Sequence, residues 1–213
     1  MIYKVYLIDG DGGISLLETT FVKLKKINDH IITNFFNVLN RTIDNLQEAM
    51  AKGRRVNEMT REIRSEDSTV IIYFHPLSRI LFCAIADADD ETERIKKVLH
   101  KIGKRFWKKH QSDLKTYRIT TEKTRFQTFT ADIENLTMGG KIAEIVPKLL
   151  LIRTVLEKIL SMGMIEDFEF QVALLCNGEN SPLAISRKLG ISRSRINEVL
   201  KKLEDLDIIT FER

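Results

Sequence analysis

The sequence predicts an α+β protein in which a five-stranded antiparallel sheet with packed helices is followed by a connector helix and a small domain of short helices. Three observations support this fold class. Strand-like segments alternate with long amphipathic helices up to residue 136, a nearly apolar helical pattern covers 147–162, and short helices divided by glycine fill the remainder. The expected domains are 1–136, 137–164 and 165–213, a reasonable division for a chain of 213 residues.

The first elements are a β-hairpin and a long helix. Ile2–Ile8 and Ile14–Phe21 are strand-like and are joined by Asp9–Gly13, whose Asp and Gly residues tolerate the positive φ of a tight turn. The helix that follows is expected to end near Gly53. Its apolar residues are spaced by three and four, which places one stripe against a sheet: Ile32, Phe35, Phe36, Leu39, Ile43, Leu46 and Met50.

Three further strands complete the predicted sheet. They are Val56–Ile63, Ser68–His75 and Arg79–Ala86, and the last two are apolar runs rich in β-branched and aromatic residues, typical of central strands. Asp87 or Asp89 is expected to cap the next helix. That helix has one apolar face, made by Ile95, Leu99, Ile102 and Phe106.

The connector is the most apolar helical pattern in the chain. A short helix over Phe126–Leu136 is expected before it, and Pro147 suits the first turn of a helix that extends to about Met162. A helix that is apolar on all sides must be covered on more than one side. The connector is therefore expected to be buried between the domains or in a homodimer, and the sequence does not choose between these two.

The last segment has the spacing of a helix-turn-helix. A helix over Phe168–Cys176 is followed by a second helix that Ser181 caps and by a third that Ser192 caps, with Gly190 in the turn between them. Ile208–Phe211 then predicts a first wing strand. The expected core positions of the second and third helices and their turn are Leu183, Ile185, Leu189, Ile191, Ile196, Val199, Leu200, Leu203 and Leu206.

Residues 181–203 closely resemble the winged-helix domains of small prokaryotic transcription regulators. The resemblance implies that the N-terminal residues of the third helix enter the major groove of DNA. The resemblance therefore implies that the residues at the bases are Ser192, Arg193, Ser194, Arg195 and Asn197, among which arginine can bond guanine and asparagine can bond adenine. Those expected at phosphates are Arg187, Lys188, Lys201 and Lys202.

Two departures from that family leave a second interpretation open. Glu198 stands where such regulators often carry a basic or small polar residue, and Arg213 comes too early for a full two-stranded wing. The winged helix could then be a protein-binding module whose basic side chains are solvated.

The basic residues are concentrated in one central segment. The chain carries a formal net charge of +4, but residues 94–125 hold 12 basic and 2 acidic side chains. A secondary basic patch is expected there, in which Phe106 and Trp107 lie among Lys101, Lys104, Arg105, Lys108 and Lys109. Such a pattern suits DNA or anionic lipid, although it equally fits an ordinary solvated face with Phe106 in the core.

Residues 1–136 resemble the longin-like domains of the roadblock/longin superfamily. The likeness lies in the order of elements: the opening hairpin Ile2–Phe21, the long helix, the hairpin Val70–Asp87 and the helix through Trp107. It implies a non-catalytic domain that binds small GTPases, other copies of itself or trafficking partners.

No residue pattern predicts catalysis, a cofactor or a metal site. Asp9-Gly10-Asp11-Gly12 lacks the later ligands of a calcium loop and is expected to be a turn, and Ile142 replaces the Ser or Thr that a phosphate loop needs after Lys141. Cys83 and Cys176 lie in apolar segments and are expected to be reduced core thiols. No signal peptide or membrane-spanning run is present, so the chain is expected to be cytoplasmic.

Two functions follow from these observations. The first is a non-enzymatic, DNA-binding transcriptional regulator whose longin-like domain senses a ligand or binds a protein, with duplex DNA as its partner. The alternative is a small-GTPase or membrane-trafficking scaffold in which the winged helix binds protein. A homodimer through the connector helix is compatible with both.

Overall fold

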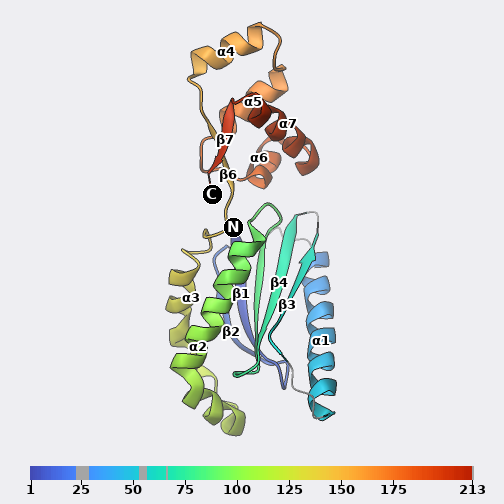
Figure 1. The fold of residues 1–213 in the computed structure, drawn as a ribbon, viewed down its shortest axis with the longest axis vertical. Coiled ribbons are helices and arrows are strands. Elements are labelled where there is room, and N and C mark those ends of the chain that lie inside the picture. The colour runs from blue at the N-terminus through green and yellow to red at the C-terminus, as the bar shows by residue number, and fades with distance from the viewer. Residues whose placement is uncertain (23–28, 53–56, 66, 213) are drawn as a thin grey trace. The chain divides into compact units, whose positions relative to one another are not determined.

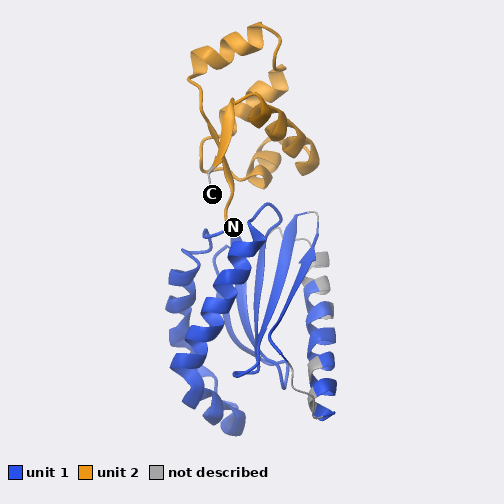
Figure 2. Cartoon of the chain, in the orientation of Figure 1, with its two compact units in different colours: residues 1–143 blue, residues 144–213 orange. Residues whose placement is uncertain are grey.

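A computed structural model describes residues 1–22, 29–52, 57–65 and 67–212 of the chain. They form two compact units, Met1–Ala143 and Glu144–Arg213 (Figures 1 and 2). The segment expected as a separate connector, 137–164, is divided between them, because 137–143 belong to the first unit and 144–164 to the second.

The first unit is built on a five-stranded antiparallel sheet, as the sequence predicts. Its order is β2-β1-β5-β4-β3, and every neighbouring pair is antiparallel. All side chains of β4 and β5 are buried, which agrees with their continuous apolar sequences. The strands are β1 (Ile2–Asp9), β2 (Ser15–Thr20), β3 (Met59–Arg64), β4 (Ser68–His75) and β5 (Ile80–Asp87).

Helices cover both faces of this sheet (Figure 1). α1 (Asp29–Ala51) packs on one face through Phe35, Leu39 and Ile43. α2 (Thr92–Thr120) and α3 (Thr130–Leu136) cover the other. The two faces differ because successive strand residues point to opposite sides.

The stripe of α1 is narrower than the sequence predicts. Phe36 was expected in it but is 47% exposed, since it lies one position beyond the face that Phe35 and Leu39 bury. The side chains of Ile32, Leu46 and Met50, and the predicted helix end at Gly53, lie outside the described residues.

α2 is longer than expected and begins without the predicted cap. Leu114 and Tyr117 continue its buried stripe beyond a kink at His110. Glu91 is the N-cap and makes no side-chain capping bond. The predicted cap Asp87 instead accepts hydrogen bonds from the Asp89 N–H (3.0 Å) and the Tyr3 hydroxyl (3.2 Å), so it stabilises the preceding turn.

Gly103 allows α2 to lie close to the sheet. A Cβ atom at this position would be 2.8 Å from Cε1 of Tyr73 on β4. After α2, the predicted helix Phe126–Leu136 is present as a 3-10 turn, η1 (Thr124–Phe129), followed by α3. Phe126, Phe129 and Ile133 from these two elements are fully buried under α2 and the sheet.

The second unit contains two short strands, one before and one after four helices in the chain. The elements in chain order are β6 (Val146–Leu149), α4 (Arg153–Ser161), α5 (Asp167–Leu175), α6 (Pro182–Leu189), α7 (Arg193–Asp205) and β7 (Ile209–Glu212).

The prediction of a helix beginning at Pro147 is wrong, because this residue lies in β6 and the helix begins only at Arg153. Proline favours an extended residue before it, and it is tolerated in edge strands. The Pro147 carbonyl accepts a bond from the Gly178 N–H (3.0 Å), and the Leu149 N–H donates to the Cys176 carbonyl (2.7 Å). The short apolar run Leu149–Ile152 fits a strand and a buried helix equally well by periodicity alone.

The last strand lies where the sequence predicts it. β7 pairs antiparallel with β6, which precedes all four helices, so that Pro147 faces Phe211 and Leu149 faces Ile209. The prediction of a strand at Ile208–Phe211 is confirmed, and its role in a wing stays a prediction.

Within the second unit, α4 is buried on one side only, and the expected cover of its other side by the first unit or by a second copy stays a prediction. Leu156 is its fully buried residue and belongs to the core of the second unit. Ile152 and Met162 are each 70% exposed, and Val155 is 38% exposed. None of the described helices is long and apolar enough to cross a membrane.

Candidate nucleic-acid interface

The turn between α6 and α7 is held by a set of local hydrogen bonds. Oγ of Ser181 accepts from the Ala184 N–H (3.2 Å), and Oγ of Ser192 accepts from the Arg195 N–H (3.4 Å), so both predicted caps are present. Gly190 adopts a φ of 66° that suits glycine at a helix C-terminus. Oγ of Ser186 donates to the Ile191 carbonyl (2.6 Å) and fixes the turn between the helices.

One face of α7 is buried, and this orients the other face toward solvent. Ile196, Val199, Leu200 and Leu203 are at most 2% exposed and pack with Val172 and Ala173 of α5. Ile191 and Leu206, which were expected in the core, are 36% and 37% exposed, because each lies beyond an end of the buried stripe.

The predicted base-contacting residues lie together at the start of α7. Ser192, Ser194, Arg195 and Asn197 are exposed, and Arg193 is half-buried. Nη1 of Arg195 is 3.1 Å from Oε2 of Glu198, so the acid that departs from the family pattern pairs with a predicted DNA contact. Both side chains are more than half exposed, and such surface pairs contribute little and exchange readily with water or another anion.

The predicted phosphate contacts fall into two groups. Arg187, Lys188 and Lys201 are exposed, and Nζ of Lys188 donates to Oδ1 of Asn180 (2.6 Å). Lys202 is engaged inside the unit, since its Nζ lies 2.6 and 2.8 Å from the two carboxylate oxygens of Glu169 on α5. Lys202 therefore joins α7 to α5, and its expected phosphate contact stays a prediction.

Glu169 was not singled out from the sequence. Burial alone would raise its pKa, but the bonds from Lys202 and from the Glu166 N–H outweigh burial and hold the pKa below its ordinary value. Glu166 and Glu169 form a capping box at the start of α5, a spacing that could have been recognised in the sequence. The bond to Lys202 could not, because it joins two helices distant in the chain.

Replacing Lys202 with methionine is expected to destabilise the second unit by about 1–3 kcal/mol at pH 7, because a nearly buried carboxylate loses its cation. A carboxyl group with a lowered folded-state pKa stabilises the fold above its unfolded pKa, and that stabilisation is lost as the pH falls below it. The difference between wild type and K202M should therefore shrink below about pH 4.

Urea unfolding followed by far-ultraviolet circular dichroism measures this effect. Trp107, the one tryptophan of the chain, lies in the first unit, so its fluorescence transition should not move in K202M. Lys201→Met, an exposed neighbour, is the matched control. An equal loss in K201M, or a K202M effect that does not change with pH, would contradict the structural role of Lys202.

The secondary basic patch is only partly free. Among its five predicted cations, Arg105 and Lys109 lie 3.0 and 2.6 Å from the Asp132 carboxylate of α3. Lys101, Lys104 and Lys108 are exposed. Phe106 is fully buried and Trp107 is half-buried against the same core, so the pair belongs to the core side of α2.

Asp9 and the two cysteines, which the sequence analysis also considered, have structural roles. Asp9 accepts the Gly12 N–H at 3.1 Å within a turn, as expected. Cys83 and Cys176 are buried and unbridged, as expected, and burial raises the pKa of both thiols, that of Cys176 to about 12. Within the described ranges, no three His, Cys, Asp or Glu side chains are grouped so that they could hold a metal ion.

Comparison with known proteins identifies one region. Residues 166–213 match the family described as "Sugar-specific transcriptional regulator TrmB". No curated protein matches the chain. The matched residues include α5, α6 and α7, so the helix-turn-helix suggests a transcriptional regulator. The match does not reach the first unit, whose likeness to longin domains stays a prediction.

Proposed function

We propose that the protein is a non-enzymatic, DNA-binding transcriptional regulator whose first unit senses a ligand or recruits a protein. The observation that carries this proposal is the exposed start of α7, where Ser194, Arg195 and Asn197 project from a helix whose other face is buried. The match of residues 166–213 to a regulator family supports it. If these polar side chains were bonded within the core, α7 would offer no surface for DNA.

Each polar side chain of this surface has a role in the proposal. Arg193 and Arg195 bond guanine bases or nearby phosphates, and Asn197 bonds adenine. Arg187, Lys188 and Lys201 contact phosphates and set the position of α7 in the groove. Arg195 exchanges its bond to Glu198 for the DNA contact. Lys202 keeps α7 attached to α5.

The proposal is tested by the fluorescence anisotropy of a labelled duplex titrated with the full chain. At about 50 mM salt the protein should bind even DNA of arbitrary sequence, and the affinity should fall steeply with added salt because phosphate contacts release counterions. Absence of binding at low salt would refute the proposal.

A homodimer through α4 is part of the proposal. Val155 of α4 is exposed, and so are Ile152 and Met162, the residues that flank the helix at its two ends. A second copy could cover these apolar side chains and would present two copies of α7 to a two-fold symmetric site.

Val155→Glu is expected to convert a dimer of about twice the chain mass into a monomer, as measured by light scattering after gel filtration. The charge would be placed at the centre of a contact that excludes water. Thr154→Glu is the matched control, because Thr154 is the exposed polar neighbour. Leu156 is unsuitable as a probe, since it lies in the core. A wild-type monomer, or a V155E dimer, would contradict the arrangement.

A protein-binding scaffold is the second candidate. Phe36, exposed on α1, favours it because a large aromatic side chain at the surface often marks a protein contact. The longin-like pattern suggests small GTPases as partners. Capture of the full chain by a GTPase in one nucleotide state, together with absent DNA binding, would favour the scaffold over the regulator.

A further inference from the structure

The cations of α2 are of two kinds. Some are paired with acids of neighbouring elements: Lys96 with Glu62 of β3 (2.7 Å), and Arg105 and Lys109 with Asp132 of α3. Others are exposed and have no ion pair within the described part of the chain. These five, which we call the lysine stripe, are Lys97, Lys101, Lys104, Lys108 and Lys115.

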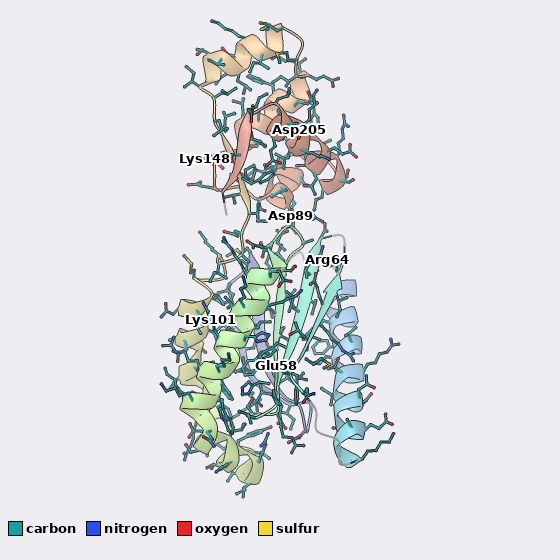
Figure 3. All side chains as sticks on the ribbon, viewed as in Figure 1. Glu58, Arg64, Asp89, Lys101, Lys148 and Asp205 are labelled. Carbon is teal, nitrogen blue, oxygen red and sulfur yellow. The ribbon has the colours of Figure 1, made fainter. Side chains whose placement is uncertain are left out.

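The stripe runs along one side of the helix. Its first four members are separated by four, three and four residues, spacings that lie on one helix face, and Lys115 follows beyond the kink at His110. Lys97 and Lys108, which both precede the kink, are about 17 Å apart along the axis at 1.5 Å per residue. The opposite side of α2 carries the buried Ile95, Ile102 and Phe106, so packing against the sheet holds the stripe outward (Figure 3, in which Lys101 is labelled).

Two open hollows lie along the stripe. One of about 410 Å³ is bordered by Thr60 of β3 and by residues of α2: Glu93, Lys96, Lys97, His100, Lys101 and Lys104. The other, of about 400 Å³, is bordered by Lys108 and Lys115 with Lys109, Gln111 and Ser112. Sites for small molecules usually enclose their ligand, whereas both of these hollows are open to solvent. Two shallow hollows bordered by lysines along one line fit an extended polyanion better than one small molecule.

We infer that the lysine stripe contacts the phosphate backbone of duplex DNA, as a second, sequence-independent contact in addition to α7. This inference rests on the proposed function, because it assumes that DNA is the polymer that the protein meets. It assigns to the first unit a direct contribution to affinity, beyond sensing or recruitment.

The side chains around the stripe favour a duplex over other polyanions. A membrane-binding helix needs an apolar face to insert among the lipids, but the exposed residues between Lys108 and Lys115 include Gln111 and Ser112. A single strand needs aromatic side chains on which its bases stack. Phe106 is fully buried and Trp107 half-buried, so these two do not form an exposed stacking surface.

The test compares two triple variants of the full chain. K101Q/K104Q/K108Q removes three charges from the stripe, and R41Q/K52Q/K141Q removes three exposed charges elsewhere on the first unit. Affinity for a duplex of about 60 base pairs, roughly 200 Å long, is measured at several salt concentrations, so that no arrangement of the two units is assumed. Equal circular dichroism spectra and melting curves establish that both variants fold.

The stripe variant should bind less tightly at low salt, and its plot of log affinity against log salt should be shallower by about 2–3, since each lost phosphate contact removes about 0.9 from the slope. The control should keep the wild-type slope. An unchanged slope in the stripe variant overturns the inference, even where wild-type binding and its loss on changing α7 support the proposed function. If wild type binds no DNA, both fail.

Vesicles containing about 30% phosphatidylserine provide the remaining comparison. If the stripe variant loses vesicle binding and keeps its DNA affinity and slope, the stripe is a lipid contact and the inference is overturned. If DNA binding alone is weakened, the inference is supported.

Discussion

Replacing Arg193 and Arg195 together with alanine is expected to weaken duplex binding by about 30-fold or more. Each arginine can form a bidentate bond with guanine that discriminates by about 1–3 kcal/mol, and two such losses combine to at least about 2 kcal/mol. The effect should be largest on a duplex that contains the preferred sequence, because there both base contacts are lost. Anisotropy titration of a labelled duplex measures it.

The matched control removes the same two charges from α4. Arg153 and Lys158 are exposed in the same unit, so R153A/K158A reports the effect of net charge alone. If this control weakens binding as much as R193A/R195A, the start of α7 is not the DNA contact. Neither pair lies in the buried core, so melting curves should remain close to that of wild type.

Replacing Phe106 with alanine is expected to destabilise the first unit by about 3–5 kcal/mol, the usual cost of removing a fully buried phenylalanine. Its ring centroid lies 5.8 Å from that of Phe82 on β5, 5.5 Å from that of Phe126 and 5.2 Å from that of Phe129. The side chain thus joins α2 to the sheet and to η1. Aromatic pairs at these distances add to the loss of buried area.

Urea unfolding monitored by Trp107 fluorescence measures this loss. Phe36→Ala is the control, since it makes the same substitution at an exposed phenylalanine and should cost little, as most surface changes do. Below its unfolding transition, F106A should still bind DNA through the second unit. Similar unfolding midpoints for F106A and F36A would show that Phe106 is not a core residue.

The fold of the first unit could be predicted because its signals are local. Windows of about 20 residues are enough to recognise two hairpins with short turns and an amphipathic helix. The segment from Pro147 could not be assigned in this way. Its apolar residues fit a strand or a helix, and the partner that decides between them, β7, comes at the other end of the unit.

The candidate site was predictable to the same degree. The caps Ser181 and Ser192 and the exposed start of α7 follow from spacing alone. Which cations are free does not, because an acid elsewhere in the fold decides it. Asp132 forms ion pairs with Arg105 and Lys109, and Glu169 forms one with Lys202. The sequence alone does not distinguish these three cations from the neighbouring ones that are unpaired within the described part of the chain.

The pairing of β6 with β7 also sets the order in which the second unit can fold. These strands close a loop that contains α4, α5, α6 and α7, and the entropy lost on closing a loop grows with its length. Helices form from local contacts and need no such closure. The helix-turn-helix should therefore form first. The two strands should pair last, after the helices have packed.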